Sequence, residues 1–151
     1  MLDVLRASSF ALVFALLSCR QNDDPEGAES LLEQVQADGY RSWARAPGYE
    51  ARRASSAPHS DAVEIFVNDV VSTALASGPG LAEWPVGSIV VKDGYTDDGE
   101  LELVAVMEKR DAGWYWAEYD ADGTALYSGA PSICTDCHES GSDFVRAFPL
   151  P

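Results

Sequence analysis

The feature of this 151-residue chain that most constrains its fold is an alternation of apolar and other residues between positions 63 and 127. Leu101, Leu103, Ala105 and Met107 are separated by charged or β-branched residues, which is the period of two expected of a strand. Turn sequences such as Asp120-Ala121-Asp122-Gly123 separate the alternating segments. We therefore expect antiparallel strands with one face toward the core, over residues 63–67, 88–93, 101–107, 114–119 and 124–127.

Two segments have helical spacing instead. Leu31, Leu32 and Val35 recur at that spacing within residues 28–37, before Gly39. Residues 69–76 predict a brief helix that the following Ser-Gly-Pro-Gly sequence ends. We expect a single α+β domain over residues 28–151, mainly an antiparallel β-sheet with a short N-terminal helix and a C-terminal helical segment.

That C-terminal segment contains Cys134-Thr135-Asp136-Cys137-His138, a C-x-x-C-H motif. The motif is the attachment signature of a c-type haem. On one helical turn its two thiols reach the two haem vinyl groups while the imidazole points at the iron. We expect Cys134 and Cys137 to form thioethers with one covalent haem c, and His138 to be the axial ligand of its iron.

Two other uses of these residues fit the sequence less well. A zinc site of the usual kind needs four thiolate or imidazole ligands, and outside the motif the only other Cys and His are Cys19 and His59. A thioredoxin-like redox pair lies at a helix start after a strand in a βαβ unit, whereas this pair lies near the end of the chain and precedes His138.

The position of the motif also separates classes of haem protein. Small electron carriers with an N-terminal motif use a later Met as ligand, but only thirteen residues follow His138 and none is Met. Four-helix cytochromes c-prime need long helical periods, and residues 63–127 alternate instead.

The N-terminus predicts export. After Met1–Arg6, residues 7–17 are uncharged and mostly apolar, a length that suits a signal peptide and falls short of the about 20 residues that span a bilayer. Leu16-Leu17-Ser18-Cys19 resembles a lipoprotein cleavage site. We expect a lipoprotein signal peptide over 1–18, lipidation at Cys19, a tether over 19–27 and a periplasmic, lipid-anchored domain. An ordinary secretory signal, with Cys19 unmodified, is the alternative.

Charge narrows the class of partner. Twenty-five acidic and ten basic residues give a formal net charge of −15. This balance argues against nucleic acid as a partner and suits a small neutral or cationic molecule, or a basic redox protein. An acidic surface that serves solubility alone is the alternative.

From about Tyr40 onward the chain resembles the cytochrome P-460 family and the related β-type cytochromes c-prime. The combination that carries the resemblance is an aromatic-Pro-x-Gly-x-x-x-x-Lys stretch, Trp84 to Lys92, followed by a C-terminal C-x-x-C-H motif. The supporting segments are Ala57-Pro58-His59-Ser60, residues 63–69, Trp114-Tyr115-Trp116 with Tyr119, and residues 143–149.

This resemblance implies small nitrogen compounds, hydroxylamine or nitric oxide, as substrates or ligands. It also implies that Lys92 forms an additional covalent link to the porphyrin edge; a solvent-facing Lys92 is the alternative. Membrane contact would be through the lipid anchor alone. Related proteins are often homodimers, so a homodimer is consistent with the resemblance.

The chain departs from the family pattern on the distal side of the haem. The family's distal carboxylate falls near Ala105 and its distal arginine near Val63. Period-two geometry places Glu102 and Glu108 on the face opposite Ala105. His59 and Met107 are the other candidates for a sixth iron ligand. We expect a five-coordinate iron with an open or water-occupied distal side.

Three functions are compatible with these residues. An oxidoreductase acting on hydroxylamine or nitric oxide needs a proton acceptor near the bound molecule. A nitric-oxide-binding cytochrome needs only an open site in an apolar pocket. An electron-transfer cytochrome without turnover needs a six-coordinate iron, with His59 or Met107 as the second ligand.

Overall fold

The computed structural model describes residues 22–56 and 58–151. Its elements follow the chain in the order α1 (Pro25–Ala37), the 3-10 helix η1 (Tyr40–Ser42), β1 (Ala44–Arg45), β2 (Arg53–Ala54), β3 (Ala62–Val67), α2 (Asp69–Ala76), β4 (Ile89–Tyr95), β5 (Leu101–Arg110), β6 (Gly113–Asp120), β7 (Ala125–Gly129) and α3 (Ser132–His138).

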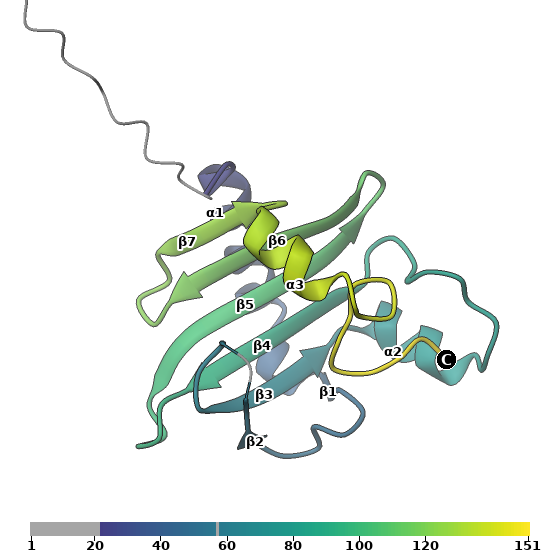
Figure 1. The fold of residues 1–151 in the computed structure, drawn as a ribbon, viewed down its shortest axis with the longest axis horizontal. Coiled ribbons are helices and arrows are strands. Elements are labelled where there is room, and N and C mark those ends of the chain that lie inside the picture. Colours follow the sequence, from purple (N-terminus) through teal and green to yellow (C-terminus); the bar gives the residue numbers. More distant parts are fainter. Residues whose placement is uncertain (1–21, 57) are drawn as a thin grey trace, which may run out of the picture.

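The strands form one antiparallel sheet in the order β1-β3-β4-β5-β6-β7, with β2 paired to β3. Helix α1 crosses one face of this sheet, whereas α3 and the C-terminal segment (residues 139–151) lie over the other (Figure 1). The predicted α+β class, with its N-terminal and C-terminal helices, is confirmed. Among the described residues, no helix is both long enough and apolar enough to cross a membrane.

Helix α1 begins at Pro25, three residues before the predicted start. Asp24 caps the helix by accepting a hydrogen bond from the Gly27 backbone N–H at 3.1 Å. Pro25 stands in the first turn, where a missing N–H costs nothing. Residues 25–27 of the predicted tether are therefore helical. The start of the helix is also attached to the sheet, because the Asp24 backbone N–H donates to Ser128 Oγ on β7.

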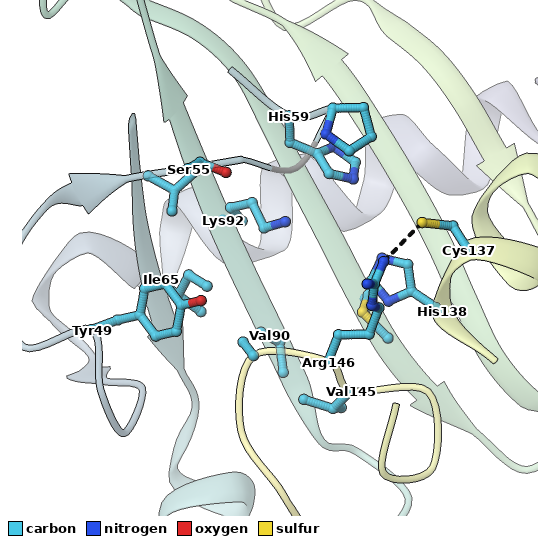
Figure 2. Close-up of a pocket in the computed structure, with 14 residues that line it drawn as sticks. Tyr49, Ser55, His59, Ile65, Val90, Lys92, Cys137, His138, Val145 and Arg146 are labelled. Carbon is cyan, nitrogen blue, oxygen red and sulfur yellow. Dashed lines mark hydrogen bonds between the residues drawn. The ribbon is translucent and has the colours of Figure 1, made fainter. Parts of the chain in front are cut away.

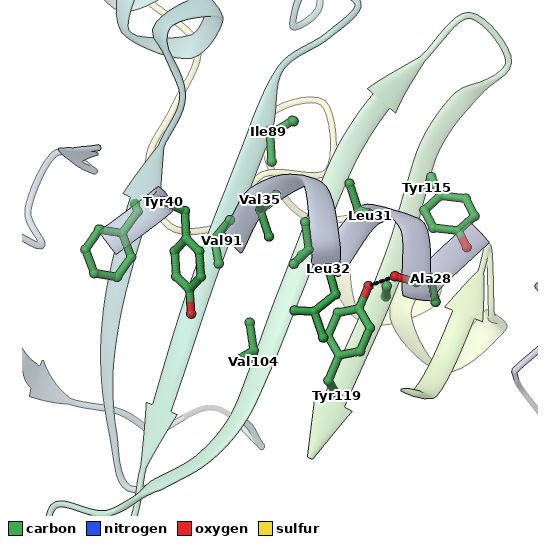
Figure 3. Close-up of a cluster of buried hydrophobic side chains, with 13 residues drawn as sticks. Ala28, Leu31, Leu32, Val35, Tyr40, Ile89, Val91, Val104, Tyr115 and Tyr119 are labelled. Carbon is green, nitrogen blue, oxygen red and sulfur yellow. Dashed lines mark hydrogen bonds between the residues drawn. The ribbon is translucent and has the colours of Figure 1, made fainter. Parts of the chain in front are cut away.

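One expectation about the sheet is wrong: both faces of it are buried, not one. The first apolar cluster packs α1 against the face that carries Val91, Val104 and Tyr119, and the Tyr119 hydroxyl donates to the Ala28 carbonyl under the helix (Figure 3). The second cluster lies on the opposite face and includes Met107. The alternation marked which residues share a face, but it did not show that α1 covers the second one.

Strand β4 continues to Tyr95, two residues past its predicted end at Asp93, and its pairing with β5 shifts register between Gly94 and Tyr95. A Cβ at Gly94 would lie 2.4 Å from Ser60 Oγ. Only glycine therefore lets the loop between β2 and β3 approach the sheet this closely. This loop carries His59.

Candidate haem-attachment site

Helix α3 presents the three residues of the C-x-x-C-H motif on one wall of a cavity. Cys134, Cys137 and His138 are half-buried and line a space of about 320 Å³ between α3 and the sheet. A second, adjoining space of about 200 Å³ shares Cys137 and His138 (Figure 2). The other residues common to both are Pro58, His59, Val90, Lys92 and Met107.

His138 is held with one ring nitrogen available. Its Nδ1 lies 2.9 Å from the Phe144 carbonyl oxygen, so Nδ1 donates this hydrogen bond and Nε2 is left for a metal ion. Burial is the main cause that lowers the pKa of His138, with further lowering by Lys92, His59 and Arg146. The neutral imidazole, which is the form that binds iron, is thereby favoured.

The turn that supplies this carbonyl has an unusual backbone. Asp143 and Phe144 have φ of 45° and 66°, a region that side chains other than glycine rarely adopt. Ser142 and Val145 close the turn with two backbone hydrogen bonds of 2.9 and 3.2 Å. Asp143 is also fixed, since its carboxylate accepts from Lys109 Nζ at 2.9 Å and from the Trp84 backbone N–H at 2.8 Å.

The two sulfurs are free thiols in the described part of the chain. Burial is the main cause that raises the pKa of Cys134 to about 11, followed by the charges of Glu118 and Cys137. Arg146 donates a hydrogen bond to Cys137 Sγ at 3.0 Å. No cluster of three His, Cys, Asp or Glu side chains able to hold a metal ion occurs among the described residues. Two free thiols beside one oriented imidazole fit a covalent haem better than a tetrahedral zinc ion.

The opposite wall of the cavity is a row of residues that runs across the sheet. Lys92 on β4 pairs with Ala105 on β5, and Ala105 pairs with Glu118 on β6. Neighbours in register point to the same face, so Lys92 and Glu118 both face α3. Burial lowers the pKa of Lys92, although the charges of Glu118 and Cys137 oppose this shift. An amine with a lowered pKa is a better nucleophile at neutral pH.

His59 closes the cavity from the loop between β2 and β3. Its ring centre lies 6.4 Å from that of His138, and its Nδ1 lies 2.8 Å from Glu118 Oε2. The oxygen is not aligned with the ring N–H direction, so this contact is electrostatic rather than a well-formed hydrogen bond. The structure thus brings His59 and Lys92 to the C-x-x-C-H motif.

The other predicted residues are distributed as follows. Met107 is buried and lines both spaces, while Ala105 lines the larger and Val63 the smaller. Glu108 pairs with Arg110 and lies near α1, on the face opposite Ala105 as expected. Cys19 and residues 1–18 lie outside the described residues.

The predicted aromatic residues fill the core around this site. Trp114 and Trp116 are buried in the second apolar cluster, and Trp116 makes an edge contact with His138. Phe144 packs on Trp116, and Phe148 packs on Trp84.

Sequence reasoning missed Glu118 as a cavity residue. A signal for it was present, because the two-residue turn Asp111–Ala112 pairs Arg110 with Gly113. Counting outward from that turn places Glu118 opposite Ala105, the position where the carboxylate was judged to be absent. Arg146 was also missed as a partner of Cys137, and no local pattern predicts that contact.

Comparison with known proteins agrees with this geometry. The family model of cytochrome P460 matches residues 37–145, which is well over half of the chain. No curated protein matches the chain. The matched range covers the whole sheet, Lys92 and the C-x-x-C-H motif. The chain is therefore a haem-binding cytochrome and belongs to the cytochrome P460 family.

Proposed function

We propose that this protein is an exported cytochrome with one covalent haem c, and that the haem binds or oxidises small nitrogen compounds such as hydroxylamine and nitric oxide. The observation that carries the proposal is the set Cys134, Cys137 and His138, with two free thiols and an imidazole whose Nδ1 is tied to Phe144. Members of the cytochrome P460 family oxidise hydroxylamine, which supports this substrate class.

The residues of α3 would hold the haem. Cys134 and Cys137 would form the two thioethers, and His138 would bind the iron through Nε2. When bound, the iron supplies a site for a nitrogen ligand and accepts electrons from it. The second apolar cluster, with Met107 and Trp116, would keep water away from a haem bound there.

Oxidation of hydroxylamine also releases protons, which a group in the cavity must accept. Glu118 lines the cavity, and its side chain is only 16% exposed. The Glu118 carboxylate could accept these protons in place of the family's distal carboxylate, which is absent at Ala105. The presence of Glu118 therefore favours hydroxylamine oxidation. Binding of nitric oxide without turnover would need only an apolar pocket.

The partners follow from charge and location. The electrons must pass to an acceptor, and a basic redox protein suits a chain with a net charge of −15. The signal sequence with Cys19 supports a periplasmic domain anchored to a membrane by lipid alone. A homodimer is compatible with the family.

Nitric oxide binding tests the nitrogen-compound chemistry. We expect the reduced holoprotein to bind nitric oxide, with a shift of its haem absorption, because a small neutral ligand enters the apolar cavity. Stopped-flow absorption after mixing with nitric oxide measures the binding. A resting six-coordinate spectrum that added nitric oxide and hydroxylamine leave unchanged would favour the electron-transfer alternative.

We also propose the covalent link from Lys92 to the porphyrin. Its burial lowers the amine pKa, and the side chain lines both parts of the cavity. Intact-mass measurement and a pyridine haemochrome spectrum should report a bond beyond the two thioethers, and Lys92→Arg should remove it because guanidinium is a poor nucleophile. An ordinary c-type spectrum in the unmodified protein would rule the link out. Lys109→Arg, which changes the chain's other lysine, is the matched control.

A further inference from the structure

We propose that His59 is the second axial ligand of the haem iron in the resting protein, on the side opposite His138. The inference rests on the proposed attachment of haem to Cys134 and Cys137. This inference replaces the five-coordinate iron expected from the sequence. A small nitrogen compound would then reach the sixth position of the iron by displacing His59.

The spacing of the two rings is the first support. The ring centres of His59 and His138 are 6.4 Å apart, with ring planes at 76°. An imidazole nitrogen bonds to a metal ion at about 2 Å, so two imidazoles on opposite sides of one ion have centres about 6 Å apart. Rings that share the nitrogen–metal–nitrogen axis keep this spacing at any interplanar angle. The two histidines are thus spaced for one ion between them.

Both side chains border the same space. His59 and His138 each line the two adjoining parts of the cavity, and Figure 2 shows His59 on its loop and His138 on the side of α3. His138 comes from α3, and His59 comes from the loop that packs against β4. A group held on α3 between them would meet one imidazole on each face.

The backbone around His59 is fixed rather than free. Ser60 has a φ of 72°, and its side chain packs where any residue larger than Gly94 would clash. The loop is closed by a hydrogen bond from the Ser55 N–H to the Asp61 carbonyl at 2.8 Å, and the Asp61 N–H donates to Tyr95 at 3.1 Å. Strained backbone of this kind persists where the surrounding structure holds a functional side chain in place.

Glu118 supplies the outer contact that a metal-binding histidine usually has. Its Oε2 lies 2.8 Å from His59 Nδ1, and the two side chains are 16% and 19% exposed. A carboxylate this close to Nδ1 leaves Nε2 as the ring nitrogen that can bind a metal ion, although the contact lacks the alignment of a hydrogen bond. His138 also has an oxygen beside Nδ1, the Phe144 carbonyl, and there the geometry is that of a hydrogen bond.

Two other residues in the cavity compete for the sixth position. Met107 is packed as a core side chain in the second apolar cluster. Lys92 is the stronger rival, because burial lowers the pKa of its amine and a neutral amine binds iron. Unlike either of them, His59 makes a ring contact with His138.

The test uses the full-length holoprotein from a host that attaches c-type haem. Ultraviolet–visible, EPR and resonance Raman spectra of the ferric protein should show six-coordinate, low-spin iron. His59→Ala should convert it to high-spin iron while haem remains attached on a denaturing gel, and added imidazole should restore the low-spin spectrum. Nitric oxide should bind His59→Ala at least about tenfold faster, since no ligand must leave first.

Matched variants decide between the rivals. Met107→Leu should keep the low-spin spectrum, and Glu118→Gln should keep the haem but shift part of it to high spin. High-spin iron in the unmodified protein, or a low-spin spectrum that survives His59→Ala, would overturn the inference. Loss of the low-spin spectrum in Lys92→Arg but not in His59→Ala would assign the ligand to Lys92 and would also overturn it.

This design separates the two proposals. Protein without any covalent haem contradicts the proposed function, and the role of His59 is lost with it. Covalent haem that is high-spin in the unmodified protein overturns the role of His59 alone, because nitric oxide and hydroxylamine can still be tested on that material.

Discussion

Protein carrying Cys134→Ala together with Cys137→Ala, in a Lys92→Arg background, should lose its covalent haem completely. The two sulfurs lie three residues apart on α3 and face the cavity, so in the proposed attachment each would provide one of the two thioether bonds. Peroxidase-type haem staining after a denaturing gel measures the loss, and the intact mass should fall by one haem. The expected result is an unstained band at the position of the full-length chain.

The control for this experiment lies between the two cysteines. Asp136→Asn changes an exposed residue of the same helix and should keep the stain at its original intensity. The Lys92→Arg background is needed because Lys92 is a third site of attachment in our proposal. Haem that survives denaturation in this triple variant would contradict attachment through Cys134 and Cys137.

Trp84→Ala should lower the free energy of unfolding by about 3–5 kcal/mol, the range for removal of a buried large aromatic side chain. Trp84 is 1% exposed, and its ring packs edge-to-face on Phe148 at 5.4 Å. Its Nε1 donates to the Ser142 carbonyl at 3.1 Å. The substitution therefore leaves a cavity and also frees the C-terminal segment that holds Phe144 beside His138. Denaturant unfolding followed by circular dichroism gives the measurement.

Trp84→Phe separates packing from hydrogen bonding in this experiment. Phenylalanine keeps an aromatic ring against Phe148 but removes the Nε1 hydrogen bond, which costs about 1 kcal/mol, plus a smaller loss of packed volume. If Trp84→Ala proved no more destabilising than Trp84→Phe, the ring would not anchor the C-terminal segment. Trp84→Ala should also broaden the haem spectrum, because the Phe144 carbonyl would no longer be fixed.

The sequence predicted the local parts of the fold well. The period of two located the five strands from β3 to β7 but not the two-residue strands β1 and β2, and the brief helix after β3 was predicted with the bounds that α2 has. These features depend on residues that are close in the chain. The packing of α1 on the second face of the sheet could not be predicted from the local sequence. The alternation in β5 is the same whether Val104 faces water or α1.

The candidate site shows the same division. Cys134, Cys137 and His138 were found because their spacing along one helical turn is itself the signal. Lys92 was found by resemblance to the family. The contact between His59 and Glu118 was not predicted, because it joins a loop to a strand nearly sixty positions away. It also depends on the packing of that loop against Gly94.

The turn at Asp143 and Phe144 has a consequence for how this cytochrome can change in evolution. Cys134, Cys137, His138 and the carbonyl that orients the imidazole all lie within residues 134–144, so one continuous stretch of chain would supply the attachment side of the proposed haem. The opposite side is assembled from β4, β5, β6 and the His59 loop. Mutations at cavity-facing sheet positions such as Ala105 can therefore alter ligand chemistry without changing Cys134, Cys137 or His138, whereas Lys109 and Trp84, which hold the turn at Asp143, connect the two sides.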